Sequence, residues 1–215
     1  MEKNHKMAVI GGGGRTGKYV VKQLLEKGYH LKLLLRNPET NTISENPNFE
    51  IVQGDVLDYD AVRMLLADCA AVISTEGQRK DEPLVASRAT SNILDAVEKS
   101  NYPFTRYISV AGLNVDTPLD KKGSETIAAT EWMKSNFPLI HEDRQKSFQI
   151  LAESNADWTL VRVPFIEFTE DRKEMAVSLQ DSPGKKIYAA DIAGFLIGQL
   201  DDDQYIRKAP FIANI

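Results

Sequence analysis

The sequence predicts an α/β protein of the Rossmann-like type, with a doubly wound parallel sheet flanked by helices in a single domain, residues 1–215. Short apolar runs alternate with helical patterns along the whole chain, as expected for parallel strands buried on both faces and joined by right-handed crossovers. The first apolar run leads directly into the glycine-rich segment 11–17. A length of 215 residues, 42% of them hydrophobic, provides one sizeable core rather than two.

The expected strands are the short apolar runs, and helices are expected where apolar residues recur with helical spacing. Gly28 is expected to end the first helix in the left-handed conformation, and Asp58 to cap the second helix. The strands are expected at residues 7–10, 31–35, 49–53, 70–74, 106–110 and 158–163, with a terminal strand near 210–212. The helices are expected at residues 15–27, 59–67 and 83–99, over the stretch that leads to Ser154, and from Asp191 to about Leu200.

Composition argues against several classes of partner. A net charge of −5 gives no reason to expect nucleic acid or an anionic membrane, so a phosphorylated ligand needs a local cluster of positive charge. Cys69 is the only cysteine and lies in an apolar context, so we expect a buried thiol and no intrachain disulfide. No segment resembles a signal peptide or a membrane span. These features predict a cytoplasmic monomer or small homo-oligomer without a metal site.

The glycine-rich turn predicts dinucleotide binding. Gly11 allows a sharp turn, Gly13 and Gly14 let the backbone approach a pyrophosphate, and Gly17 allows the helix to pack closely on the strand. Arg15 and Thr16 complete the segment, whose N–H groups stand at the positive end of a helix dipole. The spacing fits both G-x-x-G-x-x-G and G-x-G-x-x-G. A structural tight turn is the alternative.

The end of the second strand predicts NADP(H) in preference to NAD(H). An NAD site usually has an acidic residue there for the ribose hydroxyls, whereas this chain has Arg36, which suits a 2′-phosphate. Arg15 could add a second positive charge, and the alternative for Arg36 is a solvated charge at a strand end. Asp55 and Val56 follow the third strand and are expected to border the adenine, although Asp55 could equally be a turn residue.

Further site residues are expected where the later strands end, since ligands of open parallel sheets gather at the carboxyl ends of the strands. Thr75 and Gly77 follow the fourth strand, and Ser109 lies near the end of the fifth. Val163 and Pro164 end the sixth strand and are expected to form a wall of the nicotinamide pocket. Ser109 is a candidate to hydrogen-bond the nicotinamide amide or an acceptor, or it simply ends a strand.

At these residues the chain resembles the atypical short-chain dehydrogenases/reductases of the NAD(P)H-binding type, near flavin reductase and biliverdin-IXβ reductase. The resemblance implies a Rossmann-like fold, NADP binding, and a substrate pocket built from the loops after strands four to six. It is carried by the glycine turn, Leu35-Arg36-Asn37-Pro38, Gln53-Gly54-Asp55-Val56, Ile108-Ser109-Val110-Ala111-Gly112-Leu113, Asp157-Trp158-Thr159-Leu160-Val161-Arg162-Val163-Pro164 and Ala190-Asp191-Ile192-Ala193.

The chain departs from the typical family pattern at the catalytic pair. Typical members use Tyr-x-x-x-Lys as proton donor, but none of the seven tyrosines has a lysine four residues later. The pair would fall near Ile140 and Arg144. Arg144, on an otherwise apolar helical stripe, either faces a pocket or pairs with a carboxylate. His141 is a candidate proton donor, with a surface position as the favoured alternative.

Two functions fit these patterns best. The first is an NADPH-dependent reductase of a conjugated acceptor such as a flavin, a quinone or a tetrapyrrole-like compound, in which Phe165 and Phe168 offer aromatic faces or belong to the core. Reductases that the chain resembles also manage without the tyrosine–lysine pair. The second is a non-catalytic regulator that senses the NADP(H) ratio. A sugar-nucleotide epimerase or dehydratase is less favoured, because those enzymes generally need the tyrosine and a larger C-terminal lobe.

Overall fold

Eight strands form one sheet in the computed structural model, which describes residues 5–40, 47–79, 82 and 84–215. Their order is β3-β2-β1-β4-β5-β6-β10-β8, and all neighbours are parallel except β10 and β8. Strands β1 to β3 are added toward one edge of the sheet, and β4 to β6 toward the other. This switch point between β1 and β4 places a crevice at the carboxyl ends of these strands. The strands are β1 (Lys6–Ile10), β2 (His30–Leu35), β3 (Phe49–Gln53), β4 (Cys69–Ser74), β5 (Arg106–Gly112), β6 (Trp158–Val163), β8 (Met175–Ser178) and β10 (Phe211–Asn214).

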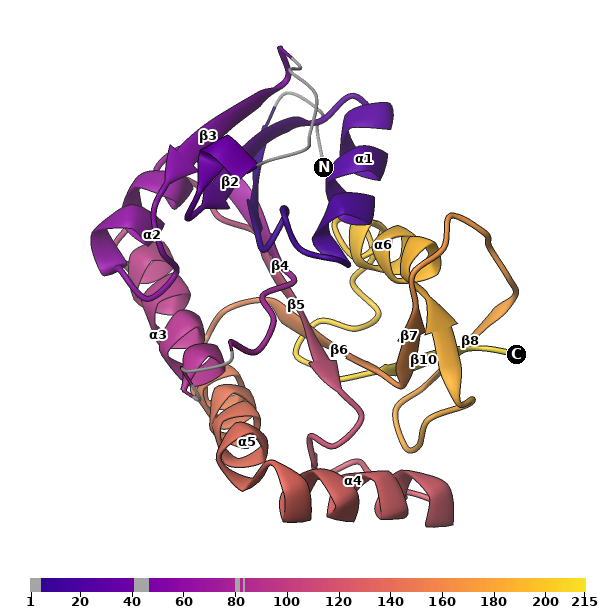
Figure 1. Ribbon diagram of the computed structural model, residues 1–215. Helices are drawn as coiled ribbons and strands as arrows, with labels where there is room; N and C mark the ends of the chain where they lie inside the picture. Colours follow the sequence, from indigo (N-terminus) through magenta and orange to yellow (C-terminus); the bar gives the residue numbers. More distant parts are fainter. Residues whose placement is uncertain (1–4, 41–46, 80–81, 83) are drawn as a thin grey trace.

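Helices cover both faces of the sheet (Figure 1). α1 (Gly17–Glu26) and α6 (Ala189–Gly198) pack together on one face, and α2 (Tyr59–Leu66), α3 (Val85–Glu98) and α5 (Pro138–Glu153) pack on the other. Every residue of β4 is buried, because this central strand has a hydrophobic layer on each side. The predicted doubly wound α/β fold is confirmed.

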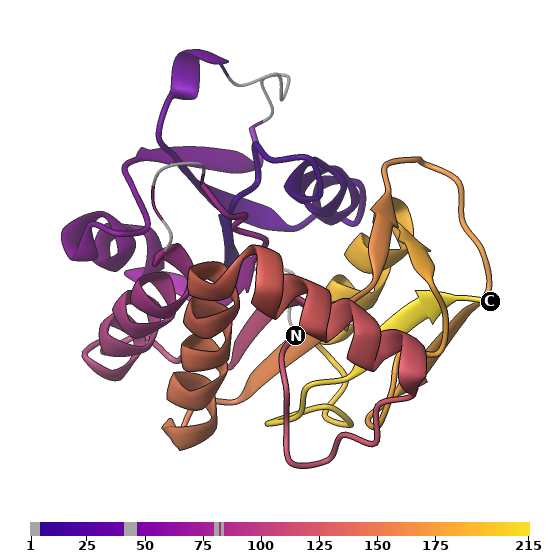
Figure 2. The same ribbon diagram turned by 60° about the horizontal axis from the view of Figure 1, so that its bottom comes forward.

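One helix stands apart from these two layers. α4 (Ser124–Asn136) crosses the bottom of the molecule in Figure 1 and comes to the front in Figure 2. The loop after β5 leads into α4, and α5 follows it immediately, so α4 lies beyond the carboxyl ends of the strands. This position puts α4 beside the crevice rather than against the sheet.

Local predictions at two helix ends are confirmed. Gly28 adopts φ of 80°, and the N–H groups of Gly28 and Tyr29 donate to Leu25 and Leu24 at the end of α1. The side chain of Asp58 accepts a hydrogen bond of 3.0 Å from the N–H of Asp60. Pro83, expected to open the third helix, lies outside the described residues.

The sequence did not reveal three short strands. β8 runs antiparallel to β10, so the sheet is not entirely parallel as expected, and β7 (Phe165–Glu167) pairs with β9 (Lys186–Tyr188) in a separate two-stranded ribbon. These strands have three or four residues, too few for a reliable pattern. No helix in the described part of the chain is long and apolar enough to cross a membrane.

Candidate functional site

The glycine turn is fixed by close contacts between backbone groups. Gly11 adopts φ of 77°, and its carbonyl accepts a hydrogen bond of 2.9 Å from the N–H of Gly14. A Cβ at Gly17 would overlap the carbonyl oxygen of Gly11, and a Cβ at Gly11 would lie 2.8 Å from the carbonyl carbon of Thr75. Glycine is therefore required at Gly11 and Gly17 by the close approach of the turn to itself and to the end of β4.

Backbone donors in this turn are available to a ligand. The N–H groups of Gly13, Arg15 and Thr16 donate to no acceptor in the part of the chain that the structure describes. These residues immediately precede α1, and the side chain of Thr16 makes no capping hydrogen bond. Unsatisfied N–H groups at the start of a helix attract an anion, both as donors and through the helix dipole. This arrangement fits the pyrophosphate of a dinucleotide.

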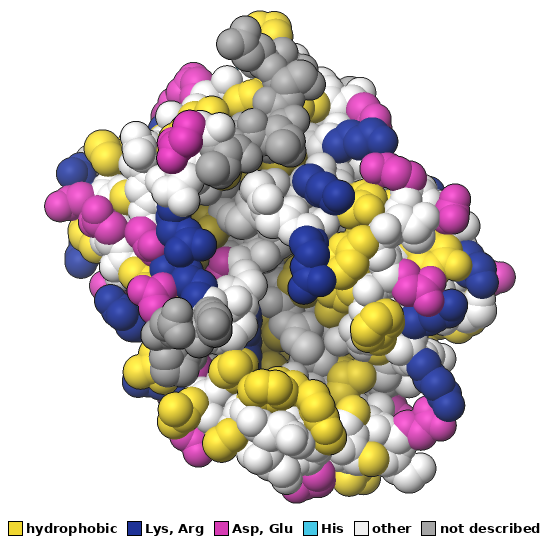
Figure 3. Space-filling view, viewed as in Figure 1, with side chains coloured by type: hydrophobic (Ala, Val, Ile, Leu, Met, Phe, Trp, Pro, Cys, Tyr) yellow, Lys and Arg dark blue, Asp and Glu magenta, His cyan; other side chains and the backbone are white. Residues whose placement is uncertain are grey.

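A hollow of about 370 Å³ opens beside the turn. Figure 3 shows it at the centre of this face, with Lys and Arg side chains on both flanks and hydrophobic side chains along its lower rim, over α4. The volume falls within the range of small-molecule sites, ~300–1,000 Å³. Seven of the residues predicted to bind the cofactor line the hollow: Gly11, Gly13, Gly14, Arg36, Val56, Thr75 and Gly77.

A charged group that the sequence did not reveal stands at the end nearest β2 and β3. Arg79 lines the hollow and holds the carboxylate of Asp55 through two hydrogen bonds of 2.8 Å. Burial raises the pKa of Asp55, but hydrogen bonds from Arg79 and from the N–H of Leu57 bring it below its ordinary value. The hydrogen bond from the N–H of Leu57, two residues on, is the kind that a turn residue makes. Arg36 is exposed and has no ion-pair partner among the described residues.

Arg144 of α5 pairs with a carboxylate at the end of β4. Its Nη1 donates to Oε1 of Glu76 at 2.8 Å, and its Nη2 donates to the Glu76 carbonyl at 3.1 Å. The other carboxylate oxygen of Glu76 accepts from the hydroxyl of Ser74 at 2.6 Å. The ion-pair interpretation of Arg144 therefore agrees with the structure, and its partner Glu76 lines the hollow.

His141 is buried, so the favoured prediction of a surface position was wrong. Its Nδ1 lies 3.1 Å from the side-chain amide nitrogen of Asn114, in the loop after β5. Amide donation to Nδ1 leaves the proton of a neutral ring on Nε2. Burial, and then the charge of Lys134, lower the pKa of His141. The loop after β5 folds back over this face of α5, and helical periodicity does not indicate such a cover.

The ends of β5 and β6 provide the neighbouring surface. Ser109 is 6% exposed, and its hydroxyl has no hydrogen-bond partner among the residues that the structure describes. It pairs in register with Ser74 at the end of β4 on one side and with Leu160 in the middle of β6 on the other. Val163 and Pro164 are buried where β6 ends. A hydroxyl without a partner among the described residues can hydrogen-bond a polar group of a ligand.

Two phenylalanines after β6 belong to the surface rather than to the core. Phe165 is 73% exposed and Phe168 is 40% exposed. The guanidinium of Arg15 lies over the ring of Phe168 at 4.7 Å from its centroid. This contact joins the glycine turn to the segment after β7, and it places an aromatic face next to the predicted phosphate-binding turn.

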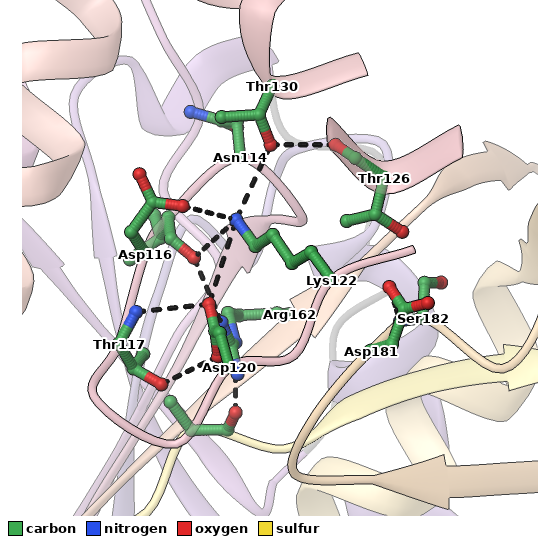
Figure 4. Close-up of polar contacts among 12 residues, drawn as sticks. Asn114, Asp116, Thr117, Asp120, Lys122, Thr126, Thr130, Arg162, Asp181 and Ser182 are labelled. Carbon is green, nitrogen blue, oxygen red and sulfur yellow. Dashed lines mark hydrogen bonds and ion pairs between the residues drawn. The ribbon is translucent and has the colours of Figure 1, made fainter. Parts of the chain in front are cut away.

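A buried polar cluster holds the loop between β5 and α4 (Figure 4). Nζ of Lys122 donates to Asp116 at 2.6 Å, and the side chain of Lys122 is only 7% exposed. Arg162 of β6 is fully buried and donates to Asp120 at 2.8 Å and to the Val115 carbonyl at 2.9 Å. This cluster was not predicted, although the arginine inside the buried strand of residues 158–163 requires a polar partner.

Comparison with known proteins relates the chain to several reductases and to one assembly factor. The photosystem II assembly factor Ycf39 of Trieres chinensis is 32% identical over 183 residues, which cover 81% of this chain and 56% of that protein. Cinnamoyl-CoA reductase 1 of Petunia hybrida is 28% identical over 143 residues, covering 61% of this chain and 42% of the reductase. The chain thus spans about half the length of these two relatives.

Solved structures share the fold at low sequence identity. A short-chain dehydrogenase/reductase from Veillonella parvula in complex with NADP matches with a TM-score of 0.76 at 15% identity, over 98% of this chain and 94% of that chain. A protein from Streptococcus pneumoniae described as a candidate NADH-flavin reductase matches with a TM-score of 0.72 at 20% identity, over 99% and 100%. The profile of one protein family matches residues 11–203, and the chain therefore belongs to the NAD(P)H-binding family.

Proposed function

We propose that the protein is a cytoplasmic NADPH-dependent reductase that transfers hydride to a conjugated acceptor, such as a flavin, a quinone or a tetrapyrrole-like compound. The observation that carries the proposal is the set of backbone donors at Gly13, Arg15 and Thr16 that have no acceptor among the described residues, beside the guanidinium of Arg36, which has no ion-pair partner among them. The donors of the turn match the pyrophosphate of a dinucleotide, and Arg36 matches the 2′-phosphate of NADP(H).

The residues divide among the parts of the cofactor. The turn holds the pyrophosphate through its backbone, and Arg36 binds the 2′-phosphate. Asp55 and Val56 border the adenine, with Asp55 offering the lone pairs that Arg79 and Leu57 leave unused. Bound NADPH supplies the hydride. The residues of the turn are Gly11, Gly13, Gly14, Arg15, Thr16 and Gly17, and those proposed for the nicotinamide half are Thr75, Gly77, Ser109, Val163 and Pro164.

Catalysis by this chain rests on orientation. The Ser109 hydroxyl donates a hydrogen bond to the nicotinamide amide or to the acceptor, and Val163 and Pro164 exclude water from one side. No tyrosine–lysine pair is available in the sequence, so the proton reaches the acceptor from water. Arg144 acts as a positioning residue, since it holds Glu76 and the end of β4. His141 is assigned a structural role, because burial favours its neutral form and Asn114 occupies its Nδ1.

The test combines binding with turnover. Calorimetric titration with NADPH and NADH is expected to give tighter binding of NADPH, and Arg36→Glu is expected to remove that preference while NADH still binds. NADPH oxidation is then followed with FMN, menadione or biliverdin as acceptor, and at least one of them is expected to accelerate it. Absence of binding by either nucleotide would overturn the assignment of the whole site.

A non-catalytic sensor of the NADP(H) ratio is the second candidate. It is favoured by the ion pair of Arg144 with Glu76, which occupies the guanidinium where the catalytic lysine is expected. The sensor predicts tight binding, unequal affinities for NADP⁺ and NADPH, and no turnover with any of the acceptors. A measurable rate with one acceptor therefore decides for the reductase.

A further inference from the structure

Three charged side chains meet at the end of the hollow proposed for the adenosine part of the cofactor. Arg36 follows β2 and Asp55 follows β3, and these two strands are paired in parallel register up to Leu35 and Gln53. The backbones of neighbouring strands lie ~5 Å apart, so residues that follow their ends start close together. Arg79 reaches the same place from the loop after β4 and lines the hollow together with Arg36.

Arg79 is committed to Asp55. The guanidinium grips both carboxylate oxygens at 2.8 Å, and the two side chains are 15% and 33% exposed. Its Nη1 also lies 2.6 Å from Glu82, whose side chain is 49% exposed. A bidentate, half-buried pair of this kind holds its geometry better than an exposed ion pair does.

Without Arg79, the carboxylate of Asp55 would face the same end of the hollow as Arg36. Against the effect of burial, the pKa of Asp55 is lowered mainly by Arg79 and the Leu57 N–H, and to a smaller extent by the charge of Arg36. An unpaired carboxylate there would repel a 2′-phosphate and would compete with it for the Arg36 guanidinium. Neither effect would act on NADH, which lacks that phosphate.

We propose that Arg79 is a specificity-determining residue for the 2′-phosphate, and that it acts by neutralising Asp55 so that Arg36 stays available. This inference rests on the proposed function, because it assumes that the hollow binds NADP(H). It assigns the discrimination between the two nucleotides to a pair of residues, 24 positions apart, in addition to the cation after β2.

The experiment measures Kd for NADPH and NADH by titration of the full-length protein, at low and high salt. Arg79→Ala is expected to weaken NADPH binding about tenfold and NADH binding less than threefold, a size typical of one extra charge near a partly exposed phosphate. The double variant Arg79→Ala/Asp55→Asn is expected to recover the wild-type ratio of the two Kd values to within about threefold. The loss of NADPH affinity in Arg79→Ala should be smaller at high salt, because salt screens the charge of Asp55.

Two further variants separate charge from shape. Arg79→Lys keeps the positive charge and should retain most of the preference for NADPH. Glu82→Gln removes the second carboxylate bound to Arg79 without exposing Asp55, so it should not weaken NADPH binding. Thermal unfolding of each variant identifies any that fail to fold, and Arg79→Lys with Glu82→Gln then carries the comparison.

Two results would overturn the inference while leaving the proposed function intact. One is equal weakening of both nucleotides in Arg79→Ala, and the other is no recovery in the double variant, since either would mean that Arg79 contacts the cofactor directly. If the wild-type protein binds NADPH no better than NADH, the inference and the proposed preference fail together.

Discussion

Gly17→Ala tests whether the glycine turn depends on the close approach of its two ends. The new Cβ would lie 2.7 Å from the Gly11 carbonyl carbon and 2.8 Å from Cα of Gly12, and closer still to the Gly11 oxygen. All three are backbone atoms, so no side-chain rotation relieves the overlap. Gly11 cannot retreat freely, because the hydroxyl of Thr75 donates to its carbonyl at 3.3 Å.

The expected cost follows from overpacking. Forcing one carbon into a filled site costs ~1–3 kcal/mol, and a smaller entropic gain from replacing glycine offsets part of it. A net loss of ~2 kcal/mol corresponds to a decrease in Tm of ~4–8 °C for a protein of this size. Because the displaced turn carries the proposed phosphate donors, NADPH affinity should fall at least tenfold, that is by ~1.4 kcal/mol or more.

Circular dichroism gives the thermal transition, and titration with NADPH gives the affinity. Gly198→Ala is the matched control, since Gly198 ends α6 and a Cβ there meets nothing within 4 Å. The control should keep its affinity, and its Tm should stay equal to that of wild type or rise slightly. A Tm for Gly17→Ala equal to that of wild type would refute the steric argument, and a lowered Tm with unchanged NADPH affinity would refute the role of the turn in binding.

Three further expectations concern groups away from the turn. Burial raises the pKa of the Cys69 thiol to about 12, so it should resist alkylation at pH 8 until denaturant is added. The pKa of His141 is lowered from 6.5 in the folded state, so the unfolded state binds the proton first as the pH falls below about 6.5. The unfolding free energy of the wild-type protein should therefore decrease more steeply with falling pH than that of His141→Asn. Lys122→Met should lower the unfolding free energy by ~1–2 kcal/mol, because Asp116 and the largely buried Asp120 both lose the charge of the Lys122 Nζ. Lys185→Met, at an exposed pair with Glu125, should cost less than ~0.5 kcal/mol.

The central part of the fold was predictable because its strands bury both faces. Such strands appear as mostly apolar runs, and the predicted ends at Ile10, Ser74 and Val163 coincide with those of β1, β4 and β6. Strands that lie partly exposed lack this pattern. All four residues of β8 are intermediate in exposure, so their pairing with β10 depends on tertiary context that local sequence does not record.

Part of the candidate site was also predictable from local sequence, and part was not. The backbone donors follow from glycines at fixed spacing, which are visible in the sequence. The side-chain part of the site depends on partners far apart: Arg144 and Glu76 are separated by 68 positions, and their pairing required the sheet to bring α5 beside the end of β4. The apolar stripe around Arg144 indicated that a partner or ligand must exist, but not which one.

The attachment of α4 suggests how the acceptor side of the hollow behaves. The buried residues of α4 are Thr126 and Thr130, while Ile127 and Trp132 are 50% and 56% exposed. At its start, α4 is held by a hydrogen bond of 2.9 Å from the N–H of Gly123 to Asp181. A helix fixed by polar contacts rather than by apolar burial opens at lower free energy than a core helix does.

The amides of α4 should therefore exchange with deuterium at least tenfold faster than those of α1, which packs its apolar face against α6. Mass spectrometry of peptides covering residues 124–136 and 17–26 measures the difference. Because α4 lies at the lower rim of the hollow (Figure 3), such opening would let this rim adapt to acceptors of different shape while the backbone-built cofactor side stays fixed. Equal protection of the two helices would contradict this division, and a single narrow acceptor specificity would then be the expectation.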